Sequence, residues 1–172
     1  GLAPGLKPQI KWPNDILCGG KKICGILCEM QAETDRVRHI IPGIGVNVNL
    51  TRGLLPEELR NRATSLRIET GRGFSRAAVL AAILNSFEPL YDCWRAEGLG
   101  PLLPEIRLRD ALFGRVITLN QGGGDVTGKA DGIQPDGALR LATAQGMISI
   151  YSGEAHLANK GELWSIGQHK TR

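Results

Sequence analysis

The residues best suited to chemistry lie in three short motifs in the first third of the sequence. Residues 11–15 read Lys-Trp-Pro-Asn-Asp, residues 22–27 read Lys-Ile-Cys-Gly-Ile-Leu, and residues 43–49 read Gly-Ile-Gly-Val-Asn-Val-Asn. Each motif is weak evidence by itself, because an edge lysine is usually solvated and a Pro-Asn-Asp string is usually a turn. Their combination is more informative, since it joins cationic side chains, amide side chains and glycines, which leave the backbone accessible.

These residue types suit a ligand that carries negative charge and a polar head group. Lys11 and Lys22 supply two cations, and a hairpin after Asp15 can bring them together. Asn14 and Asn47 each offer a hydrogen-bond donor and an acceptor. The alternate glycines of the third motif allow a ligand or another backbone to approach closely. The sequence shows no Ser-His-Asp set, no carboxylate pair of obvious spacing and no metal-binding cluster, so we assign no metal ligand.

The elements that must position these motifs are predicted to be strands. Residues 16–29 indicate a hairpin around the Gly19-Gly20 turn, and residues 38–49 indicate a third strand in a buried sheet. A second segment begins at Ser75, a plausible N-cap, and ends at Gly98. Its apolar residues recur at spacings of three and four, which predicts an amphipathic helix packed on the sheet. The residues of this stripe are Val79, Leu80, Ile83, Leu84, Phe87, Leu90, Tyr91 and Trp94.

A third segment, over residues 112–158, is predicted to form a small barrel. Short β-rich runs alternate there with turn residues such as Pro135-Asp136-Gly137. The triple glycine at 122–124 indicates a hairpin turn and not a phosphate loop, because no Lys-Ser/Thr follows it. A unit of this size has a marginal core of its own. We therefore expect this unit to pack against the helix near Trp94 or against a shorter helix over residues 102–110.

Composition restricts the class of protein. The chain has 172 residues, 42% of them hydrophobic, and a net charge of +4 without a block of like charges. It is therefore expected to fold and is not expected to bind nucleic acid through a basic tract. No apolar run is long enough to cross a membrane, and no signal peptide is evident. The four cysteines lack metal or disulfide spacing, which predicts reduced, buried side chains in a cytoplasmic protein.

In order and spacing, the three motifs resemble those of biotin protein ligases. The Ala-Thr-Ser-Leu string at 63–66 and the barrel-like end are also similar to that family, so the resemblance covers residues 1–157. It implies an α+β fold of the class II aminoacyl-tRNA synthetase and biotin ligase type. Residues 1–110 would form the carboxy-terminal part of the catalytic domain, with a mixed sheet packed on helices. Residues 111–158 would form an SH3-like β-barrel, and residues 159–172 a tail.

The resemblance also implies a reaction. In this family biotin and ATP, with Mg²⁺, form biotinyl-5'-AMP, and biotin then passes to a lysine of a biotin carboxyl carrier protein, such as that of acetyl-CoA carboxylase. Lys22 would be the catalytic cation, beside the adenylate oxygens. The residues implied in binding substrate and nucleotide are Lys11, Trp12, Asn14, Asp15, Gly25, Gly43, Gly45 and Asn47. Among these, Lys11 would support the phosphates, and Trp12 would serve as core or pocket wall.

Two departures from the family pattern bear on activity. The sequence lacks the Gly/Arg-rich loop that folds over biotin in this family, and its barrel offers no terminal arginine. The chain also has no initiator Met, so we expect it to be a piece of a longer protein that is inactive in isolation. DNA binding would need an upstream domain, and a homodimer remains open. Two alternatives are a carrier-binding or dimerisation module and a lipoate or octanoyl transferase.

Overall fold

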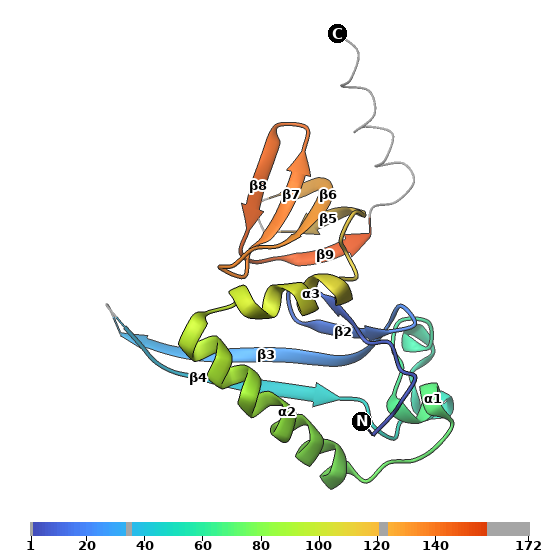
Figure 1. Ribbon diagram of the computed structural model, residues 1–172. Coiled ribbons are helices and arrows are strands. Elements are labelled where there is room, and N and C mark those ends of the chain that lie inside the picture. Colours follow the sequence, from blue (N-terminus) through green and yellow to red (C-terminus); the bar gives the residue numbers. More distant parts are fainter. Residues whose placement is uncertain (1, 34–35, 121–123, 158–172) are drawn as a thin grey trace. The chain divides into compact units, whose positions relative to one another are not determined.

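The computed structural model describes residues 2–33, 36–120 and 124–157, which form two sheets with a small number of helices (Figure 1). The chain divides into two compact units. The first contains the chain up to Gln9 and Asn14–Phe87, and the second contains Ile10–Pro13 and the described chain from Glu88 onward. The domain boundary expected at residue 110 stays a prediction, and the expected tail lies outside the described residues.

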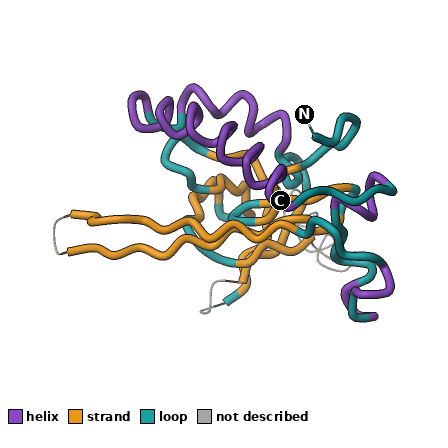
Figure 2. The backbone as a smooth tube through the Cα atoms, turned by 90° about the horizontal axis from the view of Figure 1, so that it is seen from below, coloured by secondary structure: helices purple, strands orange, loops and turns teal. Residues whose placement is uncertain are grey.

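The first sheet has the order β1-β2-β3-β4. Its strands are β1 (Gln9–Lys11), β2 (Asp15–Cys18), β3 (Lys21–Glu33) and β4 (Arg36–Val46). The predicted hairpin is confirmed, because β2 and β3 pair antiparallel around Gly19-Gly20, where both glycines have positive φ angles. Figure 2 shows β3 and β4 as a long antiparallel pair.

Helices follow this sheet in the sequence. Two 3₁₀ turns at Arg52–Leu54 and Glu57–Leu59 lead to α1 (Leu66–Thr70) and then α2 (Arg76–Glu97). The Ser65 side chain accepts a hydrogen bond from the Ile68 amide, which caps α1. The predicted start and end of the long helix are confirmed: the Ala78 amide donates to the Ser75 hydroxyl, and the helix stops before Gly98, whose φ of 71° is left-handed.

The second unit closes a dense apolar core. After the 3₁₀ turn Gly100–Leu102 come α3 (Leu103–Arg109) and five strands: β5 (Val116–Asn120), β6 (Asp125–Ile133), β7 (Leu139–Thr143), β8 (Gly146–Ile150) and β9 (Glu154–Leu157). The core includes side chains with no solvent exposure, and Leu103 of α3 belongs to it. The expectation that these strands lean on the short helix is thus confirmed, whereas Trp94 is exposed.

Two details of the expected sheets are wrong. The second sheet has the order β8-β7-β6-β5-β9, with β8 and β9 at its edges, so in the described residues it is not closed into a barrel. The chain turns back after β8 and pairs β9 with β5, which leaves the outer edge of β8 unpaired within this sheet. The first sheet is not mixed in its described ladders, because β2, β3 and β4 pair antiparallel as consecutive strands.

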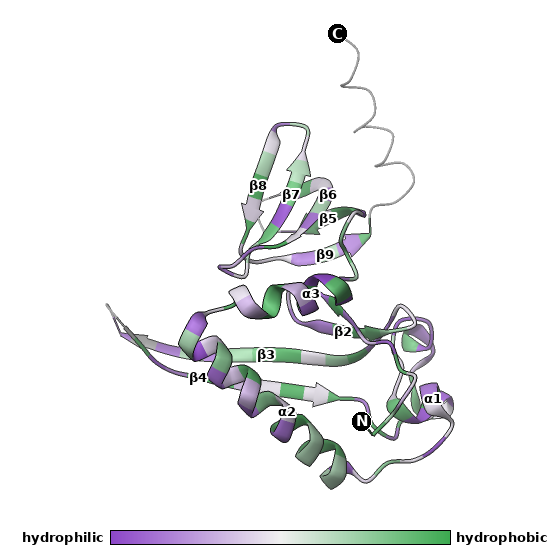
Figure 3. Cartoon of the chain, viewed as in Figure 1, coloured by the Kyte–Doolittle hydropathy of each residue, from purple (hydrophilic) through white to green (hydrophobic). Residues whose placement is uncertain are grey.

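The expected burial of the first unit is also wrong in part. Along α2 only Val79 is buried, while the rest of the apolar stripe in this unit includes exposed side chains such as Leu84 and Phe87. Ile40 and Ile41 of β4 are exposed as well, and Figure 3 shows hydrophobic stretches along β3 and α2. Periodicity identifies residues that gain from being covered, but it does not identify the surface that covers them. The described residues contain no such surface.

The cysteines follow the same division. All four are free, and Cys18 and Cys24 are buried as expected. Cys28 is exposed and Cys93 is half-buried, so the expectation of burial is wrong for these two. Cys28 lies beyond the part of β3 that is covered by the first unit's small core. No described helix is long and apolar enough to cross a membrane.

Candidate functional site

The candidate site is built on a row of residues across three neighbouring strands. Asp15 of β2 is opposite Gly25 of β3, and Gly25 is opposite Gly45 of β4. Residues opposite one another in an antiparallel sheet project to the same face. The sequence therefore places one carboxylate beside two positions without side chains. The pairing depends on a β-bulge between Ile16 and Leu17, where the register set by the two-glycine turn shifts by one residue.

Lys22 lies over this row. Its ammonium Nζ is 2.5 Å from Oδ1 of Asp15, and its side chain is 47% exposed, so a ligand can reach the charge. Half-exposed ion pairs contribute roughly 0–1 kcal/mol to stability. The pair therefore matters more for where it holds the ammonium group than for folding.

Gly25 makes room for that lysine. A Cβ atom built on Gly25 would lie 3.0 Å from both Cε and Nζ of Lys22, closer than ordinary contact. At Gly43 it would lie 3.2 Å from the Leu27 carbonyl oxygen, whereas at Gly45 it would meet only the Gly25 carbonyl oxygen at 3.7 Å. A side chain at position 25 would thus displace the tip of Lys22 by a few tenths of an ångström, while space at Gly45 is left for something else.

The three glycines share their face with an exposed leucine. Leu27 is opposite Gly43, two residues along from the pair of Gly25 and Gly45, so all four lie on the same side of the sheet. Leu27 is 67% exposed. The result is an exposed surface of backbone and one apolar side chain beside a fixed cation, which suits a ligand that has both an apolar part and an acidic group.

The backbone of Lys22 is held from a second side. Its amide donates to the Arg62 carbonyl oxygen at 2.8 Å, and its own carbonyl accepts from the Thr64 amide at 2.9 Å. These bonds form a parallel bridge with Ala63, outside the main ladders. Contacts within the first unit therefore hold both the ammonium group and the backbone of Lys22.

A buried polar network supports that segment. Thr64 is fully buried; its hydroxyl donates to Oε1 of Glu69 at 2.5 Å, and its carbonyl accepts from Nδ2 of Asn47 at 3.0 Å. The neighbouring Ser65 is also fully buried and donates to the Leu50 carbonyl. The side-chain amide nitrogen of Asn47 thus donates within the protein, which leaves the side-chain oxygen Oδ1 as the atom suited to a ligand.

Two thiols near the network, Cys18 and Cys24, have raised pKa values. Burial raises the pKa of Cys18, and the adjacent Glu69 carboxylate raises it further. Burial also raises the pKa of Cys24; Lys22 opposes this shift and Asp15 adds to it. A thiol is a nucleophile only as thiolate. Both cysteines are therefore packing residues.

The remaining predicted site residues are not all brought to this row. Asn14 is exposed, and its backbone carbonyl accepts from the Ile26 amide at 2.8 Å. Lys11 and Trp12 belong to the second compact unit. Trp12 is buried there, as expected of a core residue. The expectation that Lys11 comes close to Lys22 stays a prediction.

Sequence reasoning noticed the string at 63–66 but missed its role. Thr64 and Glu69 carry no reactive pattern, and their polar side chains meet only because α1 follows at once. The available signal was a pair of hydroxyl residues directly before a short helix. Among the residues that the structure describes, no three His, Cys, Asp or Glu side chains gather in a way that could hold a metal ion.

Comparison with known families gives two matches within the chain. Residues 4–47 match the family model described as the biotin/lipoate A/B protein ligase family, and residues 112–157 match the biotin protein ligase C terminal domain. The first match contains the motif at 11–15, the hairpin and the glycines of β4. The second contains all five strands of the second sheet.

Individual relatives agree with these matches. The chain is 45% identical over 158 residues to the bifunctional ligase/repressor BirA of Bacillus subtilis, covering 90% of this chain and 48% of the relative. It is 31% identical over 161 residues to the biotin–[acetyl-CoA-carboxylase] ligase of Paracoccus denitrificans, covering 90% of this chain and 65% of that protein. The chain thus spans about half the length of its Bacillus relatives.

Solved structures show the same likeness. The biotin protein ligase of Aquifex aeolicus in complex with biotin and ATP superposes with a TM-score of 0.74 and 31% identity, covering 89% of this chain and 62% of that one. Its apo structure gives a TM-score of 0.77 and 29% identity, covering 88% of this chain and 66% of that one.

Proposed function

The chain belongs to the biotin protein ligase family, and from this premise we propose that the full-length protein makes biotinyl-5'-AMP and transfers biotin to a protein lysine. In the first step a biotin carboxylate oxygen attacks the α-phosphorus of ATP and pyrophosphate leaves. In the second step the lysine amine attacks the acyl carbon, AMP leaves, and the amine loses a proton.

One observation carries this proposal: the ammonium group of Lys22 is held beside a surface of glycine backbone. Negative charge builds on oxygen atoms in both transition states. A preorganised cation beside such oxygens typically accelerates a reaction by about 10² to 10³-fold. Asp15 and the Arg62–Thr64 segment fix Lys22 before the substrate arrives, so little reorganisation is needed.

The glycine surface supplies the complementary half of the site. We propose that the ring system of biotin lies against Gly43 and Gly45, with Leu27 as its apolar contact and with Lys22, over Gly25, at its edge. The space above Gly45 supports this placement, since no described side chain of this unit lies within 4 Å of the position of a Cβ atom there. The side chain of the bound biotin would then direct its terminal carboxylate toward Lys22.

The nucleotide side rests on the amides and the second lysine. Lys11 would face the phosphates, and Asn14 and the carbonyl oxygen of Asn47 would bind phosphate, ribose or the accompanying ion. Mg²⁺ usually reaches such sites bound to substrate phosphates, with few protein carboxylates. The donor set of this chain fits that mode, because the Asp15 carboxylate is already paired with Lys22. The ion would offset charge on the departing pyrophosphate.

The acceptor is proposed to be a biotin carboxyl carrier protein. The name of the Paracoccus relative, a biotin–[acetyl-CoA-carboxylase] ligase, supports this substrate class. A cytoplasmic location is part of the proposal, because the spacing of the four cysteines in the sequence indicates no disulfide framework. Repression, named for the Bacillus relatives, is not included, because the match covers 48% of them.

The test uses the full-length protein with biotin, Mg²⁺ and labelled pyrophosphate. We expect biotin-dependent exchange of label into ATP, followed by biotin transfer when a carrier domain is added. Lipoate and octanoate serve as matched acids. Exchange that depends on lipoate or octanoate and not on biotin would contradict the proposal and favour an acyl transferase of the lipoate type.

A further inference from the structure

Trp12 is placed in the chemical motif at 11–15 but packed in the core of the second unit. Its side chain is 5% exposed and lies in the same cluster as Leu103, Leu112 and Leu139. Its indole Nε1–H donates to the Gly137 carbonyl oxygen at 3.1 Å, across 125 residues of sequence. A tryptophan on a turn beside a ligand would not need either feature.

The same short segment is held at its other end. The Ile10 carbonyl oxygen accepts from the Ala111 amide at 2.8 Å, in a parallel bridge between Ile10 and Asp110. Asp110 in turn accepts from the Leu112 amide through its side chain. Lys11 lies between the two anchored residues and is also the last residue of β1, so these contacts of the second unit restrain its backbone at both neighbouring residues.

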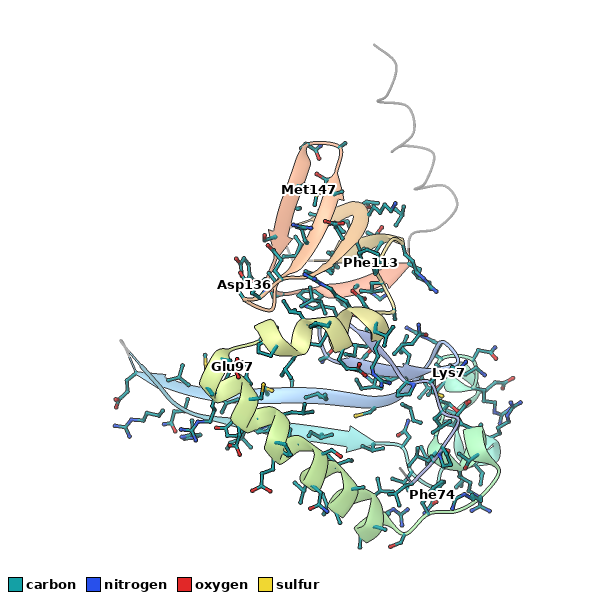
Figure 4. The ribbon with its side chains drawn as sticks, in the orientation of Figure 1. Lys7, Phe74, Glu97, Phe113, Asp136 and Met147 are labelled. Atoms are coloured by element: carbon teal, nitrogen blue, oxygen red, sulfur yellow. The ribbon has the colours of Figure 1, made fainter. Side chains whose placement is uncertain are left out.

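The Gly137 carbonyl, which accepts the hydrogen bond from the Trp12 indole, lies in a turn that is held by several hydrogen bonds. The Gly137 amide donates to the Gln134 carbonyl, and the Gln134 amide donates to the Ala138 carbonyl, each at 2.9 Å. Asp136 accepts from the Ala138 amide and from the Tyr151 hydroxyl, both at 3.0 Å. Figure 4 shows Asp136 at one end of the β7–β8 hairpin, with Met147 toward the other.

We propose that Trp12 is a positioning residue, through which the second sheet holds Lys11 in place for the nucleotide. The inference rests on the proposed function. The C-terminal sheet then takes part in adenylate formation through a fixed backbone, and Trp12 touches no substrate. A lysine whose backbone is anchored on both sides loses little conformational freedom when phosphate binds.

The experiment compares Trp12→Phe with wild type in the full-length protein. Phenylalanine keeps an aromatic ring in the core but removes the N–H donor. Biotin-dependent pyrophosphate exchange is measured against ATP and, separately, against biotin. We expect the KM for ATP to rise roughly 3- to 10-fold, the range for one lost hydrogen bond, while the KM for biotin stays within about 2-fold. Trp94→Phe, at an exposed tryptophan of α2, is the matched control and should change neither value.

A second readout does not depend on activity. Amide hydrogen exchange of the peptide covering residues 9–15 should be faster in Trp12→Phe, with the melting temperature of the protein close to wild type. Trp12→Ala should raise both the KM for ATP and the rate of amide exchange over residues 9–15 further than Trp12→Phe does.

Three results would overturn the inference: an unchanged KM for ATP, an equal rise in both KM values, or activity that is lost only in step with folded protein. If wild type shows no biotin-dependent exchange, the proposed function fails and the catalytic part of the inference fails with it. Faster hydrogen exchange in the variant would then still support the anchor. A wild type that exchanges normally beside a normal variant overturns the inference alone.

Discussion

The two compact units use their apolar residues in different ways. In the second unit Ile117, Leu119, Leu139 and Leu141 have no exposure, and the core is closed by the unit's own strands and α3. In the first unit the buried apolar cluster is small, and apolar side chains on both β3 and α2 remain exposed. The first unit also contains a buried polar network, in which the hydroxyl of Thr64 donates to Glu69.

The larger apolar core thus lies in the second unit, while the proposed catalytic cation Lys22 lies in the first. The first unit exposes an ammonium group and glycine backbone at a place where burial would hide them. We therefore expect variants around Lys22 to change rate or affinity, and truncation of the fully buried aliphatic side chains of the second unit to change mainly stability.

The largest expected effect is that of Lys22→Ala on adenylate formation. Removing the fixed cation should slow biotin-dependent pyrophosphate exchange by about 10² to 10³-fold, with little change in melting temperature. Lys21→Ala is the matched control, because Lys21 neighbours it but donates to the Arg60 carbonyl. Exchange at the wild-type rate in Lys22→Ala would sink the proposed mechanism.

The corresponding change in the second unit is Leu139→Ala. Leu139 is fully buried, so its truncation should lower the free energy of unfolding by about 2–5 kcal/mol. Leu84→Ala, at an exposed position of α2, should change it by less than about 0.5 kcal/mol. Denaturant titration of both variants measures the contrast, and equal losses would erase the distinction between the units.

Asp15→Asn should have an intermediate effect. The amide keeps the size of the side chain but loses the charge that holds Nζ of Lys22 at 2.5 Å. We expect kcat for exchange to fall roughly 10-fold through misplacement of the cation, within the range that positioning errors cause. Glu33→Gln breaks the ion pair with Arg38 near the far end of the same sheet and serves as control. A normal kcat in Asp15→Asn would show that the ammonium group of Lys22 reaches its position without the ion pair to Asp15.

Alanine at the two facing glycines should separate lysine placement from ligand space. In Gly25→Ala the new Cβ meets Lys22 at 3.0 Å, so kcat should fall severalfold. In Gly45→Ala the new Cβ has ordinary contact with the protein at 3.7 Å, so the KM for biotin should rise and kcat should change less. Steady-state kinetics of both variants decide this, and identical profiles would remove the assigned difference.

The smallest expected effect is a pH dependence in the second unit. Hydrogen bonds from Ala138 and Tyr151 lower the pKa of Asp136. Their contribution is therefore present above the ordinary pKa of about 4 and is lost as pH falls through the lower folded value. Tyr151→Phe should slightly lower the melting temperature at neutral pH, and the difference should shrink in acid. A difference that grows in acid would reverse the assigned sign.

Much of the local structure followed from the sequence. The hairpin at 16–29, the cap at Ser75, the stop at Gly98 and the turn at 135–137 depend on nearest neighbours, and all are found. The cover of α2 could not be read in the same way. Alternating or helical periodicity records which side chains favour burial, and their partners come from elsewhere in the chain or beyond it. The exposed stripe is the clearest case.

The three motifs could be read from residue type and spacing alone. The resemblance of these motifs to biotin protein ligases then singled out Lys22 as the candidate catalytic cation. Only the tertiary structure decided what holds each motif. It paired Asp15 with Lys22, placed Gly25 beneath the lysine and tied Thr64 to Glu69 and Asn47. It also buried Trp12 against residues more than 90 positions away. The physical reason is that burial and hydrogen bonding act through space, so contacts between distant residues leave no local pattern in the sequence.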